Sequence, residues 1–125
     1  MNAALNLNFL NAKTMTDIVY ICSPYQNDIQ NNIKNAQKFC KFAVDKGYCP
    51  FAPHLFFPQF LNDNIAAERN KGFELNKNFL NVAQELWVFG KNITAGMIFE
   101  IQYFQHLQKI IKYFDFDFNF NFKEL

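Results

Sequence analysis

Residues 17–52 read DIVYICSPYQNDIQNNIKNAQKFCKFAVDKGYCPFA, which is the pattern of a strand, a helix and a second strand. The β-branched and aromatic run at 17–22 ends at a Ser-Pro turn signal and predicts a buried strand. Apolar residues then recur at steps of three and four over 28–46, which predicts an amphipathic helix that stops at Gly47. The short run at 48–52 predicts a second strand, weakened by its proline.

The same alternation continues toward the C-terminus. We expect a helix at 64–83, a strand at 85–89, a helix at 95–109 with Thr94 as its cap, and a strand at 110–114. Helices between successive strands imply crossover connections. The chain is therefore predicted to be an α/β domain, with a parallel sheet of about four to five strands and helices on both faces.

Three segments lie outside this pattern. Residues 1–16 are Asn-rich and weakly patterned, and we expect them to form an N-terminal extension of a domain at 17–114. Residues 53–63, PHLFFPQFLND, are too proline-broken for a long helix and too apolar for a solvated linker, so they are expected to wall a pocket or meet a partner. The tail at 115–125 alternates aromatic residues with Asp or Asn. It is either an added edge strand, a dimer-forming strip or low-complexity drift.

Composition excludes several classes of function. The net charge is +1, so no basic field exists for a nucleic acid polymer and no polybasic patch for a membrane. The three cysteines, Cys22, Cys40 and Cys49, have no CxxC spacing, and their odd number argues against a disulfide framework. With only His54 and His106 to help, no metal site is expected. No signal peptide or membrane span is recognisable, and we expect a cytoplasmic protein.

The expected ligand site lies beyond the carboxyl ends of the strands, where loops converge in a doubly wound sheet. Free N–H groups at the start of the last helix favour an anion or a hydroxyl-rich sugar there. The candidate binding residues in these loops are Ser23, Pro24 and Tyr25 after the first strand, His54 after the second, and Gly90, Thr94, Gly96 and Met97 after the third.

Glu100 is a candidate catalytic residue because it lies about one turn into the last helix, on a face that also carries Met97, Ile101 and Phe104. No basic residue stands at helical spacing to pair with it. A half-buried carboxylate costs free energy unless it is hydrogen-bonded or functional, and its pKa would be perturbed. The alternative is a solvent-facing glutamate in the favourable field of a helix N-terminus.

Other side chains also have two interpretations. His54 either contacts a phosphate or base, or is a turn histidine bonded to backbone. Tyr25 and Phe57 either stack on a base or belong to a core or dimer contact. Arg69 either forms a solvated helix pair with Glu68 or binds a phosphate.

Four motifs carry a family resemblance: IVYICSPY at 18–25, the run from NIKNAQ to FFPQFL at 32–61, ELWVFG at 85–90 and ITAGMIFEI at 93–101. Over 17–114 the chain resembles a bacterial and phage domain family of unknown function. That family is similar in turn to the nucleoside 2-deoxyribosyltransferases.

The resemblance implies a flavodoxin-like, Rossmann-like three-layer sandwich. It also implies cleavage or transfer at the N-glycosidic bond of a (deoxy)nucleoside or nucleotide, without a cofactor. Glu100, which follows Gly96 in GMIFE, would be the nucleophile, and Tyr20 on the first strand would position it. Because the transferases complete their sites with neighbouring subunits, a homo-oligomer is expected.

The chain departs from the transferases at two acidic positions. Where they carry an aspartate near the sugar hydroxyls, Thr94 stands here. Where they carry an aspartate that helps to protonate the leaving base, the chain reads ELNKNFLN at 74–81, without an aspartate. Asp63, Glu68 or Glu85 would have to substitute, because loss of a general acid typically lowers a rate by about 10²–10⁴.

Two classes of function therefore stay open. The first is an enzyme acting on an N-glycosidic bond, and the second is a non-catalytic binding domain in which Glu100 holds the sugar hydroxyls of a nucleotide. A third hypothesis is an interaction subunit whose apolar loop and Phe-rich tail assemble oligomers.

Overall fold

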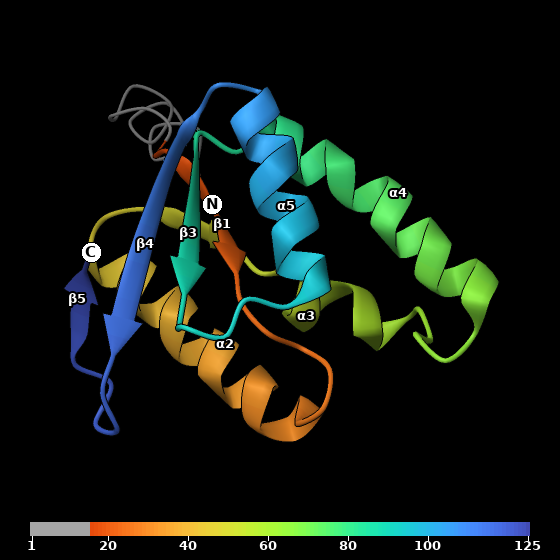
Figure 1. Cartoon of the computed structure of the whole chain (residues 1–125), viewed down its shortest axis with the longest axis horizontal. Coiled ribbons are helices and arrows are strands. Elements are labelled where there is room, and N and C mark those ends of the chain that lie inside the picture. The colour runs from red at the N-terminus through yellow and green to blue at the C-terminus, as the bar shows by residue number, and fades with distance from the viewer. Residues whose placement is uncertain (1–15) are drawn as a thin grey trace, which may run out of the picture.

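The computed structural model describes residues 16–125, which form a five-stranded sheet flanked by helices (Figure 1). The strands are β1 (Ile18–Cys22), β2 (Cys49–Phe51), β3 (Glu85–Phe89), β4 (Ile110–Phe116) and β5 (Phe122–Glu124). The helices are α2 (Ile29–Asp45), α3 (Pro53–Phe56), the 3-10 turn η1 (Phe57–Gln59), α4 (Ala66–Val82) and α5 (Ala95–His106).

The sheet has the order β2-β1-β3-β4-β5. The strands β1 to β4 run parallel, and β5 runs antiparallel to β4. This is the flavodoxin-like order of a doubly wound sheet. The order in which successive strands are added to the sheet reverses between β1 and β3. The predicted α/β class and the parallel sheet are therefore confirmed.

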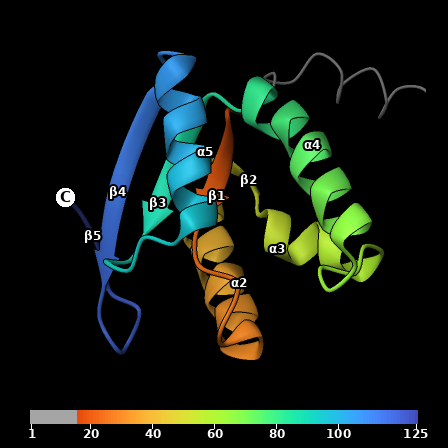
Figure 2. The same ribbon diagram turned by 45° about the vertical axis from the view of Figure 1, so that its right-hand side comes forward.

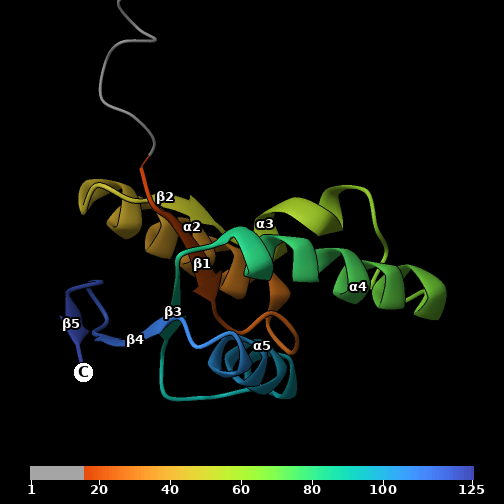
Figure 3. The ribbon, with the colours of Figure 1, turned by 90° about the horizontal axis from the view of Figure 1, so that it is seen from above.

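Alternation along β1 separates the two faces of the sheet, because successive side chains of a strand point in opposite directions. Val19 and Ile21 lie in the core cluster that includes buried residues of α2. Tyr20 and Cys22 lie in the other cluster, with buried residues of α4 and α5. The resulting three layers are visible in Figure 2, and from above in Figure 3. Tyr20 thus faces the two helices that border the ligand edge of the sheet.

The segment between β2 and α4 folds into α3 and η1 rather than an open loop. Pro53 occupies the first turn of α3, where its missing N–H leaves no hydrogen bond unmade. Phe51 of β2 stacks on Phe79 of α4, with ring centroids 3.9 Å apart and an interplanar angle of 9°. The strand β2 contains Pro50, which has no N–H to donate to a neighbouring strand. As this predicts, β2 is only three residues long and lies at the edge of the sheet.

The helix predicted to reach residue 109 ends earlier. The structure ends α5 at His106, and Gln108 adopts a left-handed backbone with φ of 57°. Lys109 turns back to α4, where its ammonium group donates to backbone carbonyls, including that of Ala83 at 2.7 Å. This interaction satisfies carbonyls at the C-terminal end of α4, which a longer α5 would leave unpaired.

The C-terminal tail joins the sheet as an edge strand. β4 extends past the predicted end at 114, and β5 pairs with it through Phe114–Glu124 and Phe116–Phe122. Phe122 stacks on Phe42 of α2, with ring centroids 4.2 Å apart. The alternation in this tail therefore gives it one face that packs against α2.

No helix within residues 16–125 is long and apolar enough to cross a membrane. The predicted extension at 1–16 lies outside the described residues, apart from Thr16.

Candidate active site

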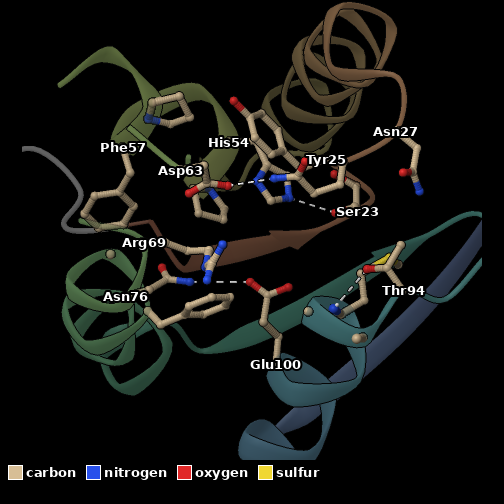
Figure 4. Close-up of a pocket in the computed structure, with 18 residues that line it drawn as sticks. Ser23, Tyr25, Asn27, His54, Phe57, Asp63, Arg69, Asn76, Thr94 and Glu100 are labelled. Carbon is tan, nitrogen blue, oxygen red and sulfur yellow. Dashed lines mark hydrogen bonds between the residues drawn. The ribbon is translucent and has the colours of Figure 1, made fainter. Parts of the chain in front are cut away.

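A cavity of about 390 Å³ opens at the carboxyl ends of β1, β2 and β3 (Figure 4). Its volume lies within the range of small-molecule sites, about 300–1,000 Å³. Loops and helices from four parts of the chain line it: Ser23, Tyr25, Gln26, Asn27, Pro53, His54, Phe57, Pro58, Asp63, Arg69, Gly72, Phe73, Asn76, Thr94, Ala95, Gly96, Met97 and Glu100.

Glu100 lies at the floor of this cavity. The helix that carries it starts where Thr94 caps α5, with the threonine Oγ1 accepting a hydrogen bond from the Met97 N–H at 3.3 Å. Glu100 follows about one turn later and is only 6% exposed. The hydroxyl of Tyr20, which β1 directs to this face, donates a hydrogen bond to its Oε2.

Two further side chains hold the carboxylate. The amide of Asn76 on α4 donates to the Tyr20 oxygen and lies 3.4 Å from Glu100 Oε2. The thiol of Cys22 lies 3.4 Å from Oε1, the other carboxylate oxygen. Donors from β1 and α4 thus reach both oxygens of Glu100 and fix the orientation of its carboxylate.

Burial dominates the protonation of Glu100. Desolvation raises the pKa of its carboxyl from 4.5 to about 7, although the hydrogen bonds from Tyr20, Cys22 and Asn76 oppose the rise. Burial, together with the nearby Glu100 charge, raises the pKa of Tyr20 and of Cys22 well above their ordinary values. Both groups therefore keep their protons and remain donors to Glu100 at neutral pH.

His54 and Tyr25 form the opposite wall. The His54 Nε2 lies 2.8 Å from the Ser23 carbonyl, and burial lowers the pKa of the imidazole despite that contact and the nearby charge of Asp63. Tyr25 stacks on the imidazole, with ring centroids 4.7 Å apart and an interplanar angle of 20°. Asp63 accepts a hydrogen bond from the Gln26 amide at 2.9 Å and lies across the cavity from Glu100 (Figure 4).

The α4 side of the cavity is aromatic and cationic. Phe57 and Phe73 line it, and Phe73 meets Phe99 of α5 with ring centroids 6.3 Å apart. Arg69 also lines the cavity, and it makes no ion pair with any residue of 16–125. The ion pair between Arg69 and Glu68, one of the two interpretations of this arginine, is not formed within the described residues. The guanidinium thus remains available to a ligand.

Most of the predicted binding residues meet in this one cavity. The residues that line it are Ser23, Tyr25, His54, Asp63, Thr94, Gly96, Met97 and Glu100, with Tyr20 behind Glu100.

Two of the predicted binding residues, Pro24 and Gly90, are not among the residues that line the cavity. The Gly90 N–H is paired with the Phe114 carbonyl at 3.0 Å, and a Cβ at Gly90 would contact the Phe116 ring at 3.6 Å. Its φ of 93° turns the chain out of β3, so this glycine serves the turn and the adjoining strand.

The three candidate proton donors, Asp63, Glu68 and Glu85, lie at different distances from the main cavity. Asp63 lines the main cavity, whereas Glu68 lines only a neighbouring one that shares Asp63 with it. Glu85 accepts hydrogen bonds from the Trp87 indole at 2.9 Å and pairs with Lys112 at 3.2 Å, at the amino end of β3. Glu85 therefore cannot reach a ligand at the carboxyl ends of the strands.

Sequence reasoning missed Asn76 and Cys22. Asn76 stands within ELNKNFLN, where the family resemblance points to an aspartate and an amide gives no comparable signal. Cys22 lies two residues after Tyr20 on the same strand and so faces the same side of the sheet, which is the signal that could have indicated its role.

Among residues 16–125, no group of three or more His, Cys, Asp or Glu side chains is arranged to hold a metal ion. The donors around Glu100 come instead from a phenol, a thiol and an amide.

Comparisons with known proteins agree with this architecture. Residues 17–114 match the model of a family described as Domain of unknown function (DUF7768). Among solved structures, the chain is similar to a 2-deoxyribosyltransferase from the psychrotolerant bacterium Bacillus psychrosaccharolyticus, described as a biocatalyst for the synthesis of antiviral and antitumoral nucleosides. The TM-score is 0.66 at 20% identity, over 78% of this chain and 72% of that one. No curated protein matches. The resemblance drawn from the motifs is confirmed, and the structural match shows a shared fold.

Proposed function

The chain belongs to this family of domains of unknown function, and from its site we propose that it cleaves or transfers the N-glycosidic bond of a nucleoside or nucleotide, with Glu100 as nucleophile. The observation that carries the proposal is the buried Glu100 carboxylate, held by Tyr20 at the floor of a cavity of ligand size. The fold shared with a 2-deoxyribosyltransferase supports the same class of chemistry.

The first step is a displacement at the anomeric carbon. A carboxylate oxygen of Glu100 attacks C1′, the bond from C1′ to the base nitrogen breaks, and its electron pair leaves with the base. The base takes up a proton, and the sugar remains as a glycosyl ester on Glu100. Hydrogen bonds from Tyr20 and Cys22 hold the carboxylate in one orientation, so reaching the transition state costs less conformational entropy.

The second step restores the enzyme. Water or a second base attacks C1′, the ester bond breaks, and Glu100 recovers its electron pair, while the acceptor loses a proton. Two displacements at one carbon retain its configuration, as in retaining glycosidases. The balance of hydrolysis and transfer depends on whether water or an acceptor base occupies the cavity.

Asp63 is the proposed source of the proton for the leaving base. It lines the same cavity on the wall opposite Glu100, so a base held between them would contact both (Figure 4). A hydrogen bond from the Gln26 amide fixes its orientation. Phe57 and Phe73 line the same side and offer faces on which a base would stack.

Base release provides the test. The protein is incubated with deoxynucleosides and their monophosphates, with and without an acceptor base, and free base is quantified. Glu100→Ala should lower release by about 10³-fold or more, because the nucleophile is removed. When the wild type is denatured during turnover, mass spectrometry of the intact protein should reveal the added mass of the sugar ester on Glu100. This added mass should be absent from the variant.

Release that survives in Glu100→Ala would reject the nucleophile. Binding of nucleotides without any release would instead support the second candidate, a binding domain. The observation that favours that candidate is Asn76, an amide that cannot supply a proton as a carboxylic acid would.

A further inference from the structure

Two buried polar atoms within residues 16–125 have no hydrogen-bond partner, Ser23 Oγ and Asn76 Oδ1. Ser23 is 2% exposed and Asn76 is 8% exposed, and both line the main cavity. Buried polar atoms are nearly always paired with protein, water or ligand, so an orphan at a cavity wall is a place where a bound ligand can supply the partner.

The start of α5 presents further unused donors at the same wall. Thr94 caps the Met97 N–H, and the Ile98 N–H bonds to the Thr94 carbonyl, but the N–H groups of Ala95 and Gly96 have no partner among the described residues. No acidic side chain lies in this first turn to offset the positive end of the helix dipole.

The orphan hydroxyl and the helix start line the same cavity. The thiol of Cys22 at the end of β1 is 3.9 Å from the Met97 carbonyl, and Ser23 is the next residue along the chain. In Figure 4, Ser23 lies beside Tyr25 and His54, and Thr94 and Arg69 lie on opposite sides of Glu100. An added Cβ at Gly96 would meet no atom within 4 Å, so a ligand can approach the backbone closely there.

From these contacts we propose that the substrate is a nucleotide, whose sugar phosphate binds Ser23 Oγ and the N–H groups of Ala95 and Gly96. One hydroxyl and two N–H donors at a helix N-terminus match the acceptor oxygens of a phosphate monoester. The inference rests on the proposed function, because it takes the anomeric carbon to lie over Glu100.

The spacing along α5 fits a phosphate on the 5′ side of the sugar. Gly96 lies one turn before Glu100, about 6 Å along the helix axis. A sugar with its anomeric carbon at Glu100 extends its exocyclic arm toward the helix start, while the base extends toward Phe57 and Asp63. Arg69 lies on the opposite side of Glu100 from Thr94 in Figure 4 and takes no part in this subsite.

Binding to a variant that does not turn over tests the subsite directly. Isothermal titration of Glu100→Gln should compare the four deoxynucleoside 5′-monophosphates with their nucleosides and with inorganic phosphate. At least one monophosphate should bind about 100-fold or more tightly than its nucleoside, since each charge-assisted hydrogen bond contributes about 10- to 100-fold. Inorganic phosphate should bind weakly and compete with the monophosphates.

Two substitutions in the same background locate the effect. Gly96→Ala should reduce the ratio of monophosphate to nucleoside affinity by tenfold or more, because its methyl group occupies the space beside the free N–H groups. Its melting temperature should rise, since alanine stabilises a helix relative to glycine. Ser23→Ala should also lower the ratio about tenfold without loss of stability, because the hydroxyl has no protein partner.

Gly72→Ala is the matched control. Gly72 lines the same cavity on α4, and its Cβ would make an ordinary contact of 3.6 Å with Leu61. This variant should keep the affinity ratio. Equal affinities for monophosphates and nucleosides, or a ratio that survives both Gly96→Ala and Ser23→Ala, would overturn the subsite. So would inorganic phosphate that binds as tightly as a monophosphate.

Base release by the wild type separates this inference from the proposed function. Release from nucleosides as fast as from monophosphates would reject the phosphate subsite and leave the Glu100 chemistry intact. Tight and Gly96-dependent binding of a monophosphate, without release, would uphold the subsite and reject that chemistry.

Discussion

The phenol of Tyr20 donates its hydrogen bond to the Glu100 carboxylate across 80 positions of sequence. Asn76 closes the arrangement by donating to the Tyr20 oxygen, so the three side chains form a directed chain of donors that ends on Glu100. Each element of the ligand-side layer contributes one member, because β1, α4 and α5 meet there. The charge on Glu100 is therefore set by the packing of that layer.

We expect Tyr20→Phe to lower the rate of base release by about 10- to 100-fold, the value of one hydrogen bond to a charged group. The loss should be accompanied by a higher apparent pKa in the pH profile of kcat, because a donor that favours the ionised carboxylate is removed. A variant with a slower rate and an unshifted profile would mean that Tyr20 acts only through packing.

The pH dependence of wild-type kcat follows from the burial of Glu100. The nucleophile must be ionised, and its pKa of about 7 lies above the ordinary value. The rate should therefore fall about tenfold per pH unit below pH 7, where Glu100 gains a proton, and fall again at high pH, where the acid that protonates the leaving base loses its own. A rate that stays constant from pH 5 to pH 8 would contradict Glu100 as the ionised nucleophile.

The sequence predicted the fold well because the signals were local. The β-branched and aromatic run in β1 and the helical spacing in α2 each depend on a few neighbouring residues. The pairing of Tyr20 with Glu100 came from the family resemblance, since spacing alone left Glu100 as either a buried or a solvent-facing residue. The structure adds the burial that distinguishes the two.

Other features depend on contacts between distant segments, which periodicity does not contain. Asn76 was missed because its role depends on how α4 is placed against β1, a relation set by the layer of Leu80 and Phe79 beneath it. The role of Gly90 is ambiguous in the sequence because a glycine after a strand serves equally well in a turn or at a ligand. Only its pairing with Phe114 separates the two.

Stability should also depend on Glu100, in the direction opposite to activity. Because folding raises the pKa from 4.5 to about 7, the folded state binds the proton more tightly than the unfolded state. The resulting stability is fully present below pH 4.5 and is lost as the pH rises to 7, on the order of 3 kcal/mol in all. The amide in Glu100→Gln is uncharged, so the variant has no penalty for burying an ionised carboxylate at high pH. It should therefore melt at a higher temperature than the wild type at pH 8, with a smaller difference at pH 4.5.

Glu74→Gln is the control for this measurement. Glu74 is exposed on α4 and pairs with Lys71 at 3.8 Å, a contact whose loss should change stability by less than about 0.5 kcal/mol. Thermal unfolding followed by circular dichroism at the two pH values gives all the comparisons. A Glu100→Gln variant that is less stable than the wild type at pH 8 would show that the hydrogen bonds outweigh the desolvation of Glu100.

The final prediction concerns proton delivery to the leaving base. Asp63→Asn keeps the shape of the side chain and an acceptor for the Gln26 amide, but it removes the acidic proton. We expect kcat for base release to fall by about 10²–10⁴. The fall should be small for a substrate analogue such as a glycosyl fluoride, because fluoride leaves without needing a proton from a carboxylic acid. Glu68→Gln is the matched acid-to-amide control, since Glu68 lines only the neighbouring cavity. Equal losses of kcat in Asp63→Asn and Glu68→Gln would remove Asp63 from the mechanism. If Asp63→Asn instead loses as much activity on the glycosyl fluoride as on the nucleoside, Asp63 would be assigned to binding. A proton donor matters only where the leaving group needs a proton.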